Sequence, residues 1–308
     1  MKIRTGVRLL RQLLLSPRRT QVFRSRVNCF LTDSFVQSYL ATPRGGDELR
    51  LARFGRKVYS QNEEDGIIGE IFRRIGTASR RFVEIGAADG LENNTVWLLL
   101  QGWSGVWIEG SRQLVAAMSR KFAPLAASGR LTFKNAFVTR ESAQQLEREG
   151  LFSGLDLLSV DIDGNDYHVV AALEKLDARL LIVEYNAKFP PPHKFVMKYR
   201  AGENLSWDLT DYHGASLAAW TELLQNRGYS LVGCNITGAN AFFVRNDLVS
   251  GKFREPLTAD NHYEPARYWL SSGFVSGHPP NFGEGHFVRH PEGAEREEGG
   301  TRRPRSQP

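Results

Sequence analysis

Residues 229–245 read YSLVGCNITGANAFFVR, two apolar runs rich in aromatic and β-branched residues on either side of a short polar turn. Only a few residues around 235–238 separate the run at 229–234 from the run at 241–245. A crossover between parallel strands needs about a dozen residues or more. The two runs must therefore pair as an antiparallel hairpin.

Upstream of this hairpin, short apolar runs alternate with helical patterns. The runs that predict strands lie at 81–85, 105–108, 131–138, 155–162 and 180–185. The patterns that predict helices lie at 94–101, 112–122, 141–149, 167–176 and 216–226. Strands and helices that alternate in this way form a parallel sheet with helices on both faces. We therefore expect an α/β fold, a doubly wound Rossmann-like seven-stranded sheet of five parallel strands followed by the antiparallel terminal hairpin.

The length and composition of the chain agree with a globular domain flanked by two other segments. Its 308 residues can bury a full core, and 41% hydrophobic and 24% charged residues are typical of globular proteins. We expect residues 1–58 to form a basic amphipathic arm and a linker, with the linker at 43–47 (PRGGD), and residues 59–280 to form the folded domain. Residues 281–308, rich in Gly, Glu, Arg and Pro, are predicted to be a disordered tail.

The positive charge of the chain is concentrated near its N-terminus. Residues 1–30 hold eight basic residues and no acidic residue, so the remaining residues carry a net charge of −2 out of a total of +6. A nearly neutral body argues against a nucleic-acid partner. Apolar and basic residues fall on opposite sides of a helical wheel near the start of the chain, which suits peripheral contact with an anionic membrane. A mitochondrial presequence in a eukaryotic source, a helix packed on the domain and a frayed arm are the alternatives.

The number of cysteines and the length of the apolar runs indicate the cellular compartment. The two cysteines, Cys29 and Cys234, with no CxxC pair, cannot supply a disulfide framework or a zinc cage. No apolar run approaches the roughly 20 residues of a membrane span. The sequence therefore predicts a cytoplasmic protein, at most peripheral to a membrane.

The first predicted strand ends in the turn FVEIGAADG at 82–90, at the position where open α/β sheets bind their ligands. A dinucleotide site would require a GxGxxG motif here, but Ala88 and Leu91 occupy two of its glycine positions. Asp89 would also place a negative charge beside the phosphates. S-adenosylmethionine has no phosphate and carries a sulfonium and an ammonium, so the acidic turn favours it over nicotinamide cofactors. An ordinary strand-to-helix turn capped by an asparagine is the alternative.

The second predicted strand ends in WIEG at 107–110, which places Glu109 19 residues after Gly90. In folds of this kind an acidic residue about 20 residues after the glycine-containing turn binds the ribose hydroxyls. The spacing therefore predicts that Glu109 holds a ribose. A solvated charge at the end of a strand is the alternative.

Three stretches give the sequence a resemblance to a known family. They are 59–67 (YSQNEEDGI), 82–95 (FVEIGAADGLENNT) and 158–166 (LSVDIDGND). Over residues 59–247 the chain resembles the FkbM-type branch of the class I S-adenosylmethionine-dependent methyltransferases, and the closing hairpin also fits. The resemblance implies methyl transfer from S-adenosylmethionine to a hydroxyl of a sugar, a glycan or a secondary metabolite.

The resemblance also implies which residues bind the cofactor. The matching positions belong to the cofactor turn, the ribose acid and the adenine edge: Glu84, Gly86, Ala87, Gly90, Glu109, Asn135 and Ala136. In such proteins a helix around 60–65 folds over the cofactor, although Ser60 and Glu63 also match a capping box for the helix that follows. Residues 162–164 read Ile-Asp-Gly where the branch commonly has Val-Glu-Gly, so the acceptor stays open.

An attacking hydroxyl must lose its proton to a positioned base or to solvent with the help of a metal ion. Asp161 and Asp163 end the fourth predicted strand and share a face, and Glu184 and Asn186 end the fifth. Oxygen ligands from adjacent strand ends could hold a divalent cation such as Mg²⁺, although no further metal signature is present. His213, in a predicted loop on the acceptor side, is another candidate base. We expect Asp161, Asp163 and His213 to be the catalytic residues, with the metal unknown.

These features predict an S-adenosylmethionine-dependent methyltransferase, with a hydroxyl of a small molecule or glycan as the acceptor. An irregular lid formed by 190–194 and Trp207 would cover that acceptor. A non-catalytic adaptor with the same fold, associated with a membrane surface, is the alternative, and it would not need to bind S-adenosylmethionine. A sugar-nucleotide dehydrogenase is disfavoured by Asp89 and by the missing glycines.

Overall fold

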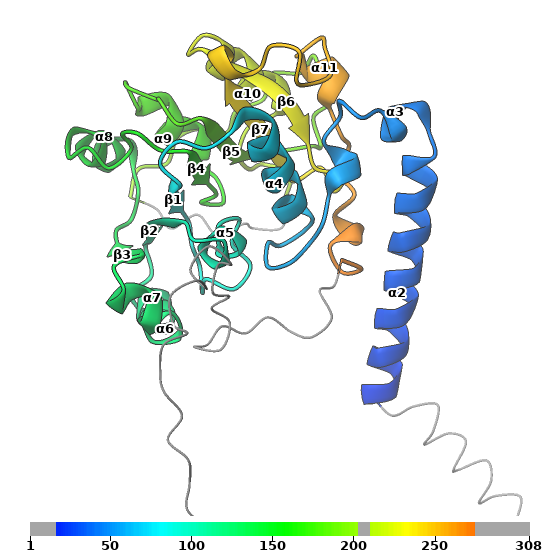
Figure 1. Ribbon diagram of the computed structural model, residues 1–308, viewed down its shortest axis with the longest axis horizontal. Coiled ribbons are helices and arrows are strands. Elements are labelled where there is room, and N and C mark those ends of the chain that lie inside the picture. Colours follow the sequence, from blue (N-terminus) through cyan, green and yellow to red (C-terminus); the bar gives the residue numbers. More distant parts are fainter. Residues whose placement is uncertain (1–16, 203–209, 275–308) are drawn as a thin grey trace, which may run out of the picture.

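The computed structural model describes residues 17–202 and 210–274, and the centre of this part of the chain is one sheet (Figure 1). Its strands lie in the order β3-β2-β1-β4-β5-β7-β6. The strands are β1 (Arg81–Ile85), β2 (Ser104–Glu109), β3 (Leu131–Asn135), β4 (Leu157–Val160), β5 (Leu180–Glu184), β6 (Tyr229–Cys234) and β7 (Asn240–Arg245).

The strands β1 to β5 run parallel, and the closing hairpin inserts β7 antiparallel to β5. β7 pairs with β5 from Val244 opposite Leu180 to Asn240 opposite Glu184. β6 lies outside β7 as the edge strand. The predicted sheet of five parallel strands and an antiparallel terminal hairpin is therefore confirmed.

Alternate residues of the strands face two separate cores. In β1, Phe82 belongs to one core and Val83 to the other, and in β2 the same is true of Trp107 and Ile108. The first core is covered by α4 (Glu64–Ile75), α5 (Val96–Leu100), α6 (Arg112–Lys121) and α7 (Ala123–Ala127). The second core is covered by α8 (Arg140–Arg148), α9 (Asp166–Ala172) and α10 (Leu217–Gln225). Both faces of the sheet are thus shielded from water, as a doubly wound fold requires.

The third and fourth strands are shorter than the sequence predicts. β3 ends at Asn135 and β4 at Val160, although apolar residues continue to 138 and 162. Residues 136–138 and 161–162 leave the sheet and line a cavity at its edge. An apolar pattern does not distinguish a strand from the apolar wall of a cavity that follows it, and the predicted ends were wrong for this reason.

The helix after residue 60 starts later than a capping box would require. α4 begins at Glu64, and its N-cap residue Glu63 makes no side-chain cap hydrogen bond. Ser60 Oγ accepts a hydrogen bond from the Asp65 N–H at 3.2 Å, and the Asp65 carboxylate accepts from the three N–H groups of residues 58–60. The capping-box interpretation is wrong because a carboxylate inside the first turn orders the segment before the helix.

Two α-helices of the described chain precede residue 59, where the predicted domain begins. They are α2 (Pro17–Leu40) and the short α3 (Pro43–Gly46). The predicted linker at 43–47 is therefore largely helical. Arg44 within it forms an ion pair with Glu264 at 2.8 Å, which ties this segment to the C-terminal part of the domain. The remaining short helices are η1 (Ala52–Phe54), η2 (Asn246–Leu248), α11 (Ala259–His262) and η3 (Tyr268–Leu270).

Parts of the two predicted terminal segments lie outside the described residues. These are residues 1–16 of the predicted basic arm and the whole predicted tail at 281–308. In the stretches of chain that the structure describes, no helix combines the length and the apolar character needed to cross a membrane.

Candidate functional site

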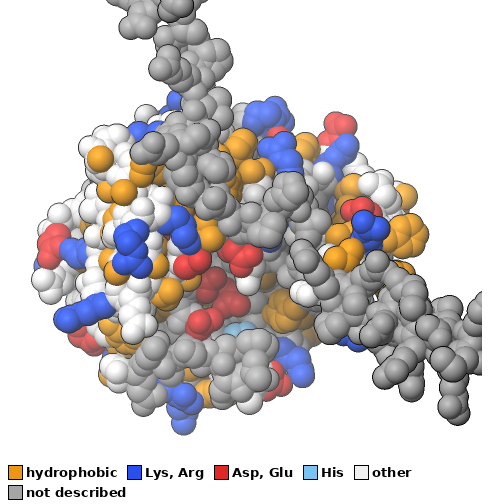
Figure 2. Space-filling model, turned by 90° about the horizontal axis from the view of Figure 1, so that it is seen from below, with side chains coloured by type: hydrophobic (Ala, Val, Ile, Leu, Met, Phe, Trp, Pro, Cys, Tyr) orange, Lys and Arg blue, Asp and Glu red, His pale blue; other side chains and the backbone are white. Residues whose placement is uncertain are grey.

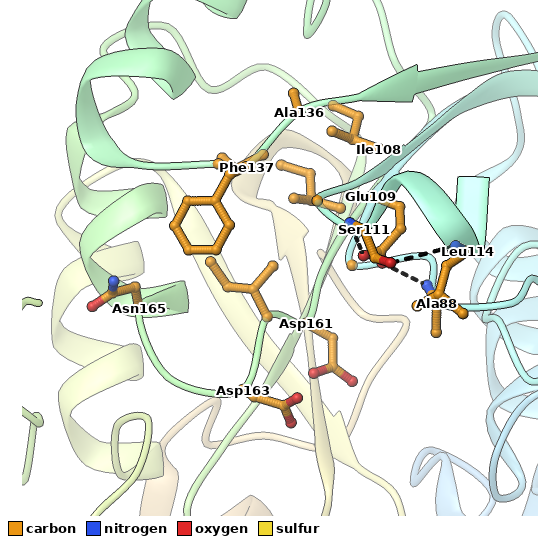
Figure 3. A pocket seen from close by; sticks show the side chains of 15 residues that line it. Ala88, Ile108, Glu109, Ser111, Leu114, Ala136, Phe137, Asp161, Asp163 and Asn165 are labelled. Atoms are coloured by element: carbon orange, nitrogen blue, oxygen red, sulfur yellow. Dashed lines mark hydrogen bonds between the residues drawn. The ribbon is translucent and has the colours of Figure 1, made fainter. Parts of the chain in front are cut away.

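A cavity of about 680 Å³ opens at the carboxyl ends of β1, β2 and β4, at the edge where the sequence predicts the ligand (Figure 3). Small-molecule sites have volumes of roughly 300–1,000 Å³. The wall combines apolar side chains, such as Ile108 and Leu114, with the carboxylates of Glu109, Asp161 and Asp163. In the space-filling view, acidic side chains gather in a hollow next to a histidine (Figure 2). The cavity suits a ligand with an apolar part, hydroxyl groups and a positive charge.

Glu109 is fixed at the end of β2 by the backbone around it. Its Oε2 accepts a hydrogen bond from the Ala88 N–H at 2.9 Å, and its Oε1 accepts one from the Ser111 N–H at 2.8 Å (Figure 3). Each carboxylate oxygen has a second lone pair. Glu109 lines the cavity and can therefore accept further hydrogen bonds from ligand hydroxyls.

The two glycines of the predicted cofactor turn have different roles. Both have positive φ, 88° at Gly86 and 81° at Gly90, which favours glycine. Gly86 lines the cavity, and a Cβ there would lie 1.5 Å from the carbonyl oxygen of Asp161. Gly90 is outside the cavity wall, and a Cβ there would lie 2.8 Å from the rings of Trp107 and Phe122. Gly86 brings two strand ends together at the site, and Gly90 allows packing behind it.

Glu84 and Ala87, also predicted to bind the cofactor, lie behind the turn. Both are buried, and neither lines the cavity. The Glu84 carboxylate accepts hydrogen bonds from the Asn94 N–H and from the Thr95 hydroxyl, and burial raises the pKa of Glu84 to about 7. The Ala87 N–H donates to the Ile108 carbonyl at 3.2 Å. These two residues shape the turn from behind.

The residues that follow β3 form another part of the cavity wall. Asn135 Nδ2 donates to the carbonyls of Glu109 and Gly110 at 2.9 and 3.0 Å, so it fixes the end of β2, while Ala136 lines the cavity itself. Phe137 also lines the cavity, and its side chain is 42% exposed (Figure 3). The sequence pattern does not indicate Phe137 as a cavity residue, because residues 131–138 match a single strand. An exposed aromatic ring beside a cavity suits stacking on a flat group such as adenine.

Three carboxylates at the ends of β4 and β5 lie close together. One oxygen of each of Asp161, Asp163 and Glu184 lies within 4.8 Å of the others. Burial and neighbouring negative charges raise the pKa of Asp161 to about 8 and that of Glu184 well above its usual range. Burial also raises the pKa of Asp163, whereas the charge of His213 lowers it. Their mutual repulsion favours a proton or another cation among these oxygens.

Asp166 shapes the loop that carries two of these carboxylates. It accepts hydrogen bonds from the N–H groups of Ile162 and Gly164 at 2.7 and 2.8 Å. Between them Asp163 has a φ of 60°, in the left-handed region that aspartate tolerates better than most residues. Asp166 is buried, so its carboxylate serves the backbone rather than a ligand.

His213 lies on a loop that Asn186 holds in place. Asn186 Nδ2 donates to the carbonyls of Asp211 and His213 at 2.8 and 2.9 Å, and it lies 3.5 Å from His213 Nδ1. His213 is not part of the cavity wall, but its charge acts on Asp163. The structure therefore places the third predicted catalytic residue beside the acidic cluster. The sequence located Asn186 at a strand end and gave no signal for its contact with residue 213.

The same three carboxylates are the residues of the described chain that could hold a divalent cation. Oxygen ligands from Asp161, Asp163 and Glu184 are of the kind that Mg²⁺ prefers. Bound there, a cation would relieve the repulsion that raises their pKa values. A proton or a positively charged part of a substrate would have the same effect, so the donor set alone does not select a metal.

Aromatic side chains gather in the segment between β5 and α10. The rings of Phe189 and Phe195 stack with their centroids 4.4 Å apart, and Tyr212 meets Phe195 edge-on at 5.7 Å. Phe189 and Phe195 flank residues 190–194, which the sequence predicts as part of an acceptor lid, and Trp207 of that lid lies outside the described residues. These rings offer an apolar surface close to His213.

No protein-family model matches the chain, and no curated protein matches its sequence. Among solved structures, the N-terminal domain of EvdMO1 with SAH bound is 12% identical, with a TM-score of 0.39 over 60% of this chain and 80% of that chain. An O-methyltransferase from Bacillus cereus in complex with SAH is 18% identical, with a TM-score of 0.32 over 59% of this chain and 74% of that chain. A SAM-dependent methyltransferase from Thiobacillus denitrificans in complex with S-adenosyl-L-homocysteine is 16% identical, with a TM-score of 0.34 over 57% of this chain and 67% of that chain.

Similarity at this level carries no argument about activity, and the fold is defined by the strand order of the chain itself. Five parallel strands in the order 3-2-1-4-5 are followed by a hairpin whose last strand, β7, inserts antiparallel beside β5. The chain has the Rossmann-like fold of the class I methyltransferases. In open sheets of this kind the ligand lies where the strand order reverses, between β1 and β4, and the cavity lies at that point.

Proposed function

We propose that the protein is an S-adenosylmethionine-dependent O-methyltransferase of the FkbM type, with a hydroxyl of a sugar, glycan or secondary metabolite as the acceptor. The observation that carries the proposal is the composition of one cavity. Glu109 lies at its β2 side, and Asp161 and Asp163 lie at its β4 side. A carboxylate that can accept hydrogen bonds from hydroxyls and carboxylates that can accept a proton thus line one ligand-sized cavity.

The residues of the cavity fit the parts of S-adenosylmethionine. Glu109 would accept hydrogen bonds from the ribose hydroxyls, while Ile108, Ala136 and Phe137 would contact the adenine. When bound, S-adenosylmethionine supplies a methyl group that a hydroxyl oxygen can attack, with S-adenosylhomocysteine as the product.

The acidic cluster would take up the proton that the hydroxyl releases. Asp161 or Asp163 can act as the general base only in its ionised form. The raised pKa values of both carboxylates make their basicity higher than that of an ordinary aspartate. His213 is the other candidate base, and in that case the aspartates would hold the acceptor.

A metal-assisted form of the same reaction uses the same residues. Asp161, Asp163 and Glu184 would hold a divalent cation that makes the acceptor hydroxyl more acidic. Treatment with a chelator distinguishes the metal-assisted reaction from the reaction without a metal. Loss of activity with a chelator and recovery with Mg²⁺ is expected only if the cation takes part.

A methyl-transfer assay tests the proposed function. The full chain is incubated with S-adenosylmethionine labelled in its methyl group and with a panel of sugars, glycans and hydroxylated metabolites. We expect label in an acceptor that has a free hydroxyl and no label in the same acceptor with that hydroxyl blocked. Binding of S-adenosylmethionine with transfer to nitrogen or carbon would reject O-methylation, and absence of binding would favour the adaptor alternative.

A further inference from the structure

The helix α2 has two opposite sides with different surroundings. One side contacts the C-terminal part of the domain. On it, Asn28 Nδ2 donates to the Ser272 hydroxyl at 3.3 Å, Thr32 is buried, and the ring of Phe35 meets Trp269 edge-on at 5.4 Å. These contacts repeat every three to four residues, as expected for one side of a helix.

The opposite side of α2 carries exposed apolar residues. Phe23, Val27 and Phe30 follow one another at intervals of four and three residues, and the turn of 3.6 residues places them away from Asn28 and Thr32. The side chains of Phe23 and Phe30 are 68% and 69% exposed. Two phenylalanines this exposed on one side of a helix form an apolar strip that nothing in the described chain covers.

Basic residues flank this strip. Arg24 and Arg26 are exposed, and neither forms an ion pair within the described residues. In the sequence no acidic residue precedes Asp33, while eight basic residues do. A second copy of the same face would bring like charges together, which opposes self-association through it. An anionic surface, by contrast, complements both the arginines and the apolar strip.

The position of α2 also suits contact with an extended surface. The helix stands at the side of the body, and its N-terminal end extends past it (Figure 1). The view from that end shows the hollow with its acidic side chains (Figure 2). The hollow is thus seen from the N-terminal end of α2, whereas the apolar strip runs along the flank of the helix.

We infer that the face of α2 formed by Phe23, Val27 and Phe30, with Arg24 and Arg26 beside it, docks on an anionic lipid membrane. The phenylalanines insert at the level of the acyl-chain boundary, and the arginines contact the lipid phosphates. The helix lies in the plane of the surface, because its other side remains packed on residues 269–273. This inference does not depend on the proposed methyl transfer.

Vesicle sedimentation with the full chain tests the docking face. Wild-type protein is expected to bind vesicles made of equal parts phosphatidylcholine and phosphatidylglycerol, and to bind pure phosphatidylcholine much more weakly. Phe23→Ser with Phe30→Ser should reduce binding to the anionic vesicles by about tenfold or more, because two aromatic side chains no longer insert into the membrane. Arg24→Glu with Arg26→Glu should reduce it by about 30-fold or more.

The control variant Arg120→Glu with Arg148→Glu makes the same change in net charge at exposed positions of α6 and α8 and should bind like the wild type. Circular dichroism and thermal unfolding verify that each variant is folded. Equal vesicle binding by the wild type and the phenylalanine variant would overturn the inference. So would equal binding to neutral vesicles, or a concentration-dependent dimer that the phenylalanine variant abolishes.

Discussion

Glu109 shows how one side chain combines a structural and a binding role. Its two oxygens accept hydrogen bonds from the N–H groups of Ala88 and Ser111. Ala88 lies in the loop after β1 and Ser111 in the loop after β2. The same carboxylate faces the cavity. Its function can therefore be tested only against a carboxylate with a similar structural role elsewhere in the protein.

Replacement of Glu109 by alanine should weaken the binding of S-adenosylmethionine by about 1–3 kcal/mol, because charge-assisted hydrogen bonds to the ribose are lost. Isothermal titration measures the change. Glu147→Ala is the matched control, since Glu147 also accepts from two backbone N–H groups, those of Glu174 and Lys175, at 2.9 and 2.7 Å. Equal affinities of the two variants for S-adenosylmethionine would contradict the assignment of Glu109 to the ribose.

The catalytic assignment predicts a loss of turnover without a loss of cofactor binding. Asp161→Asn and Asp163→Asn keep the shape of the side chain but remove the base, so kcat should fall by about 10²–10⁴ while cofactor affinity changes by only a few fold. Asp260→Asn, at an exposed position of α11, is the control and should leave kcat unchanged. Normal turnover in both aspartate variants would show that neither carboxylate is the base.

The pH dependence separates the aspartates from the histidine. Burial and nearby negative charges raise the pKa of Asp161 to about 8 in the ligand-free protein. A base must be ionised, so kcat/KM should fall by about tenfold for each pH unit below that value and level off above it. The fall of kcat/KM at low pH, the acidic limb of the profile, should be absent from Asp161→Asn. If the limb persists in Asp161→Asn and disappears in His213→Gln, the histidine is the base and the aspartates hold the acceptor.

At the scale of elements, the first turn of α4 is tied to the turn between β6 and β7. Glu63 Oε1 accepts hydrogen bonds from the N–H groups of Ile236 and Thr237 at 2.5 and 3.3 Å. Glu64 Oε1 accepts from the side-chain amides of Asn235 and Asn240 at 2.8 and 2.9 Å. Because Asn240 pairs with Glu184, this buried contact supports the end of β5 that carries part of the acidic cluster.

This contact predicts a pH-dependent stability. Burial raises the pKa of Glu63 to about 8, so the native state keeps a proton that the unfolded state releases above about pH 4.5. The native state then binds more protons, and the free energy of unfolding should fall by about 1.4 kcal/mol per pH unit between roughly pH 5 and 8 because of this residue. Urea unfolding of the wild type and of Glu63→Gln across this range measures the difference.

Glu63→Gln keeps an acceptor for the Ile236 N–H but does not titrate, so its stability should depend less steeply on pH. Glu92→Gln, at an exposed position, is the control and should retain the slope of the wild type. Parallel stability curves for the wild type and Glu63→Gln would show that residue 63 does not hold the extra proton.

Elements with a regular pattern were predictable from the sequence, and contacts across the fold were not. The short connection between the runs at 229–234 and 241–245 excluded a crossover, which was enough to define the hairpin. Glu109 lines the cavity because it ends β2, the parallel neighbour of β1, and Gly90 belongs to the turn that follows β1. Glu84 was assigned to the cofactor, but its carboxylate turns inward to Asn94 and Thr95. Whether a strand residue faces a cavity or the core behind it depends on packing that the local sequence does not encode.

The start of α4 and the position of the Phe137 ring also could not be predicted from the local sequence pattern. Ser60 and Glu63 match a capping box, yet Glu63 instead bonds to residues more than 170 positions away along the chain, at 236 and 237. Phe137 continues an apolar run, yet it leaves the strand to line the cavity. In both cases long-range contacts override a local pattern.

At the scale of the whole molecule, the strand order explains why one ligand can reach both halves of the site. β1 lies between β2, which carries Glu109, and β4, which precedes Asp161 and Asp163. A ligand that crosses the end of β1 at Gly86 meets the ribose acid on one side and the acidic cluster on the other. The acidic turn and the absence of the dinucleotide glycines favour a positively charged ligand over one with phosphates.

Isothermal titration of the full chain with S-adenosylmethionine tests this central claim most directly, with S-adenosylhomocysteine as competitor and a nicotinamide dinucleotide as comparison. We expect saturable binding at one site per chain, displacement by S-adenosylhomocysteine and no binding of the dinucleotide. Ligand at 100 times its dissociation constant should also stabilise the fold by about 2.7 kcal/mol. A folded protein that binds the dinucleotide, or that shows neither heat nor stabilisation with S-adenosylmethionine, would contradict the account.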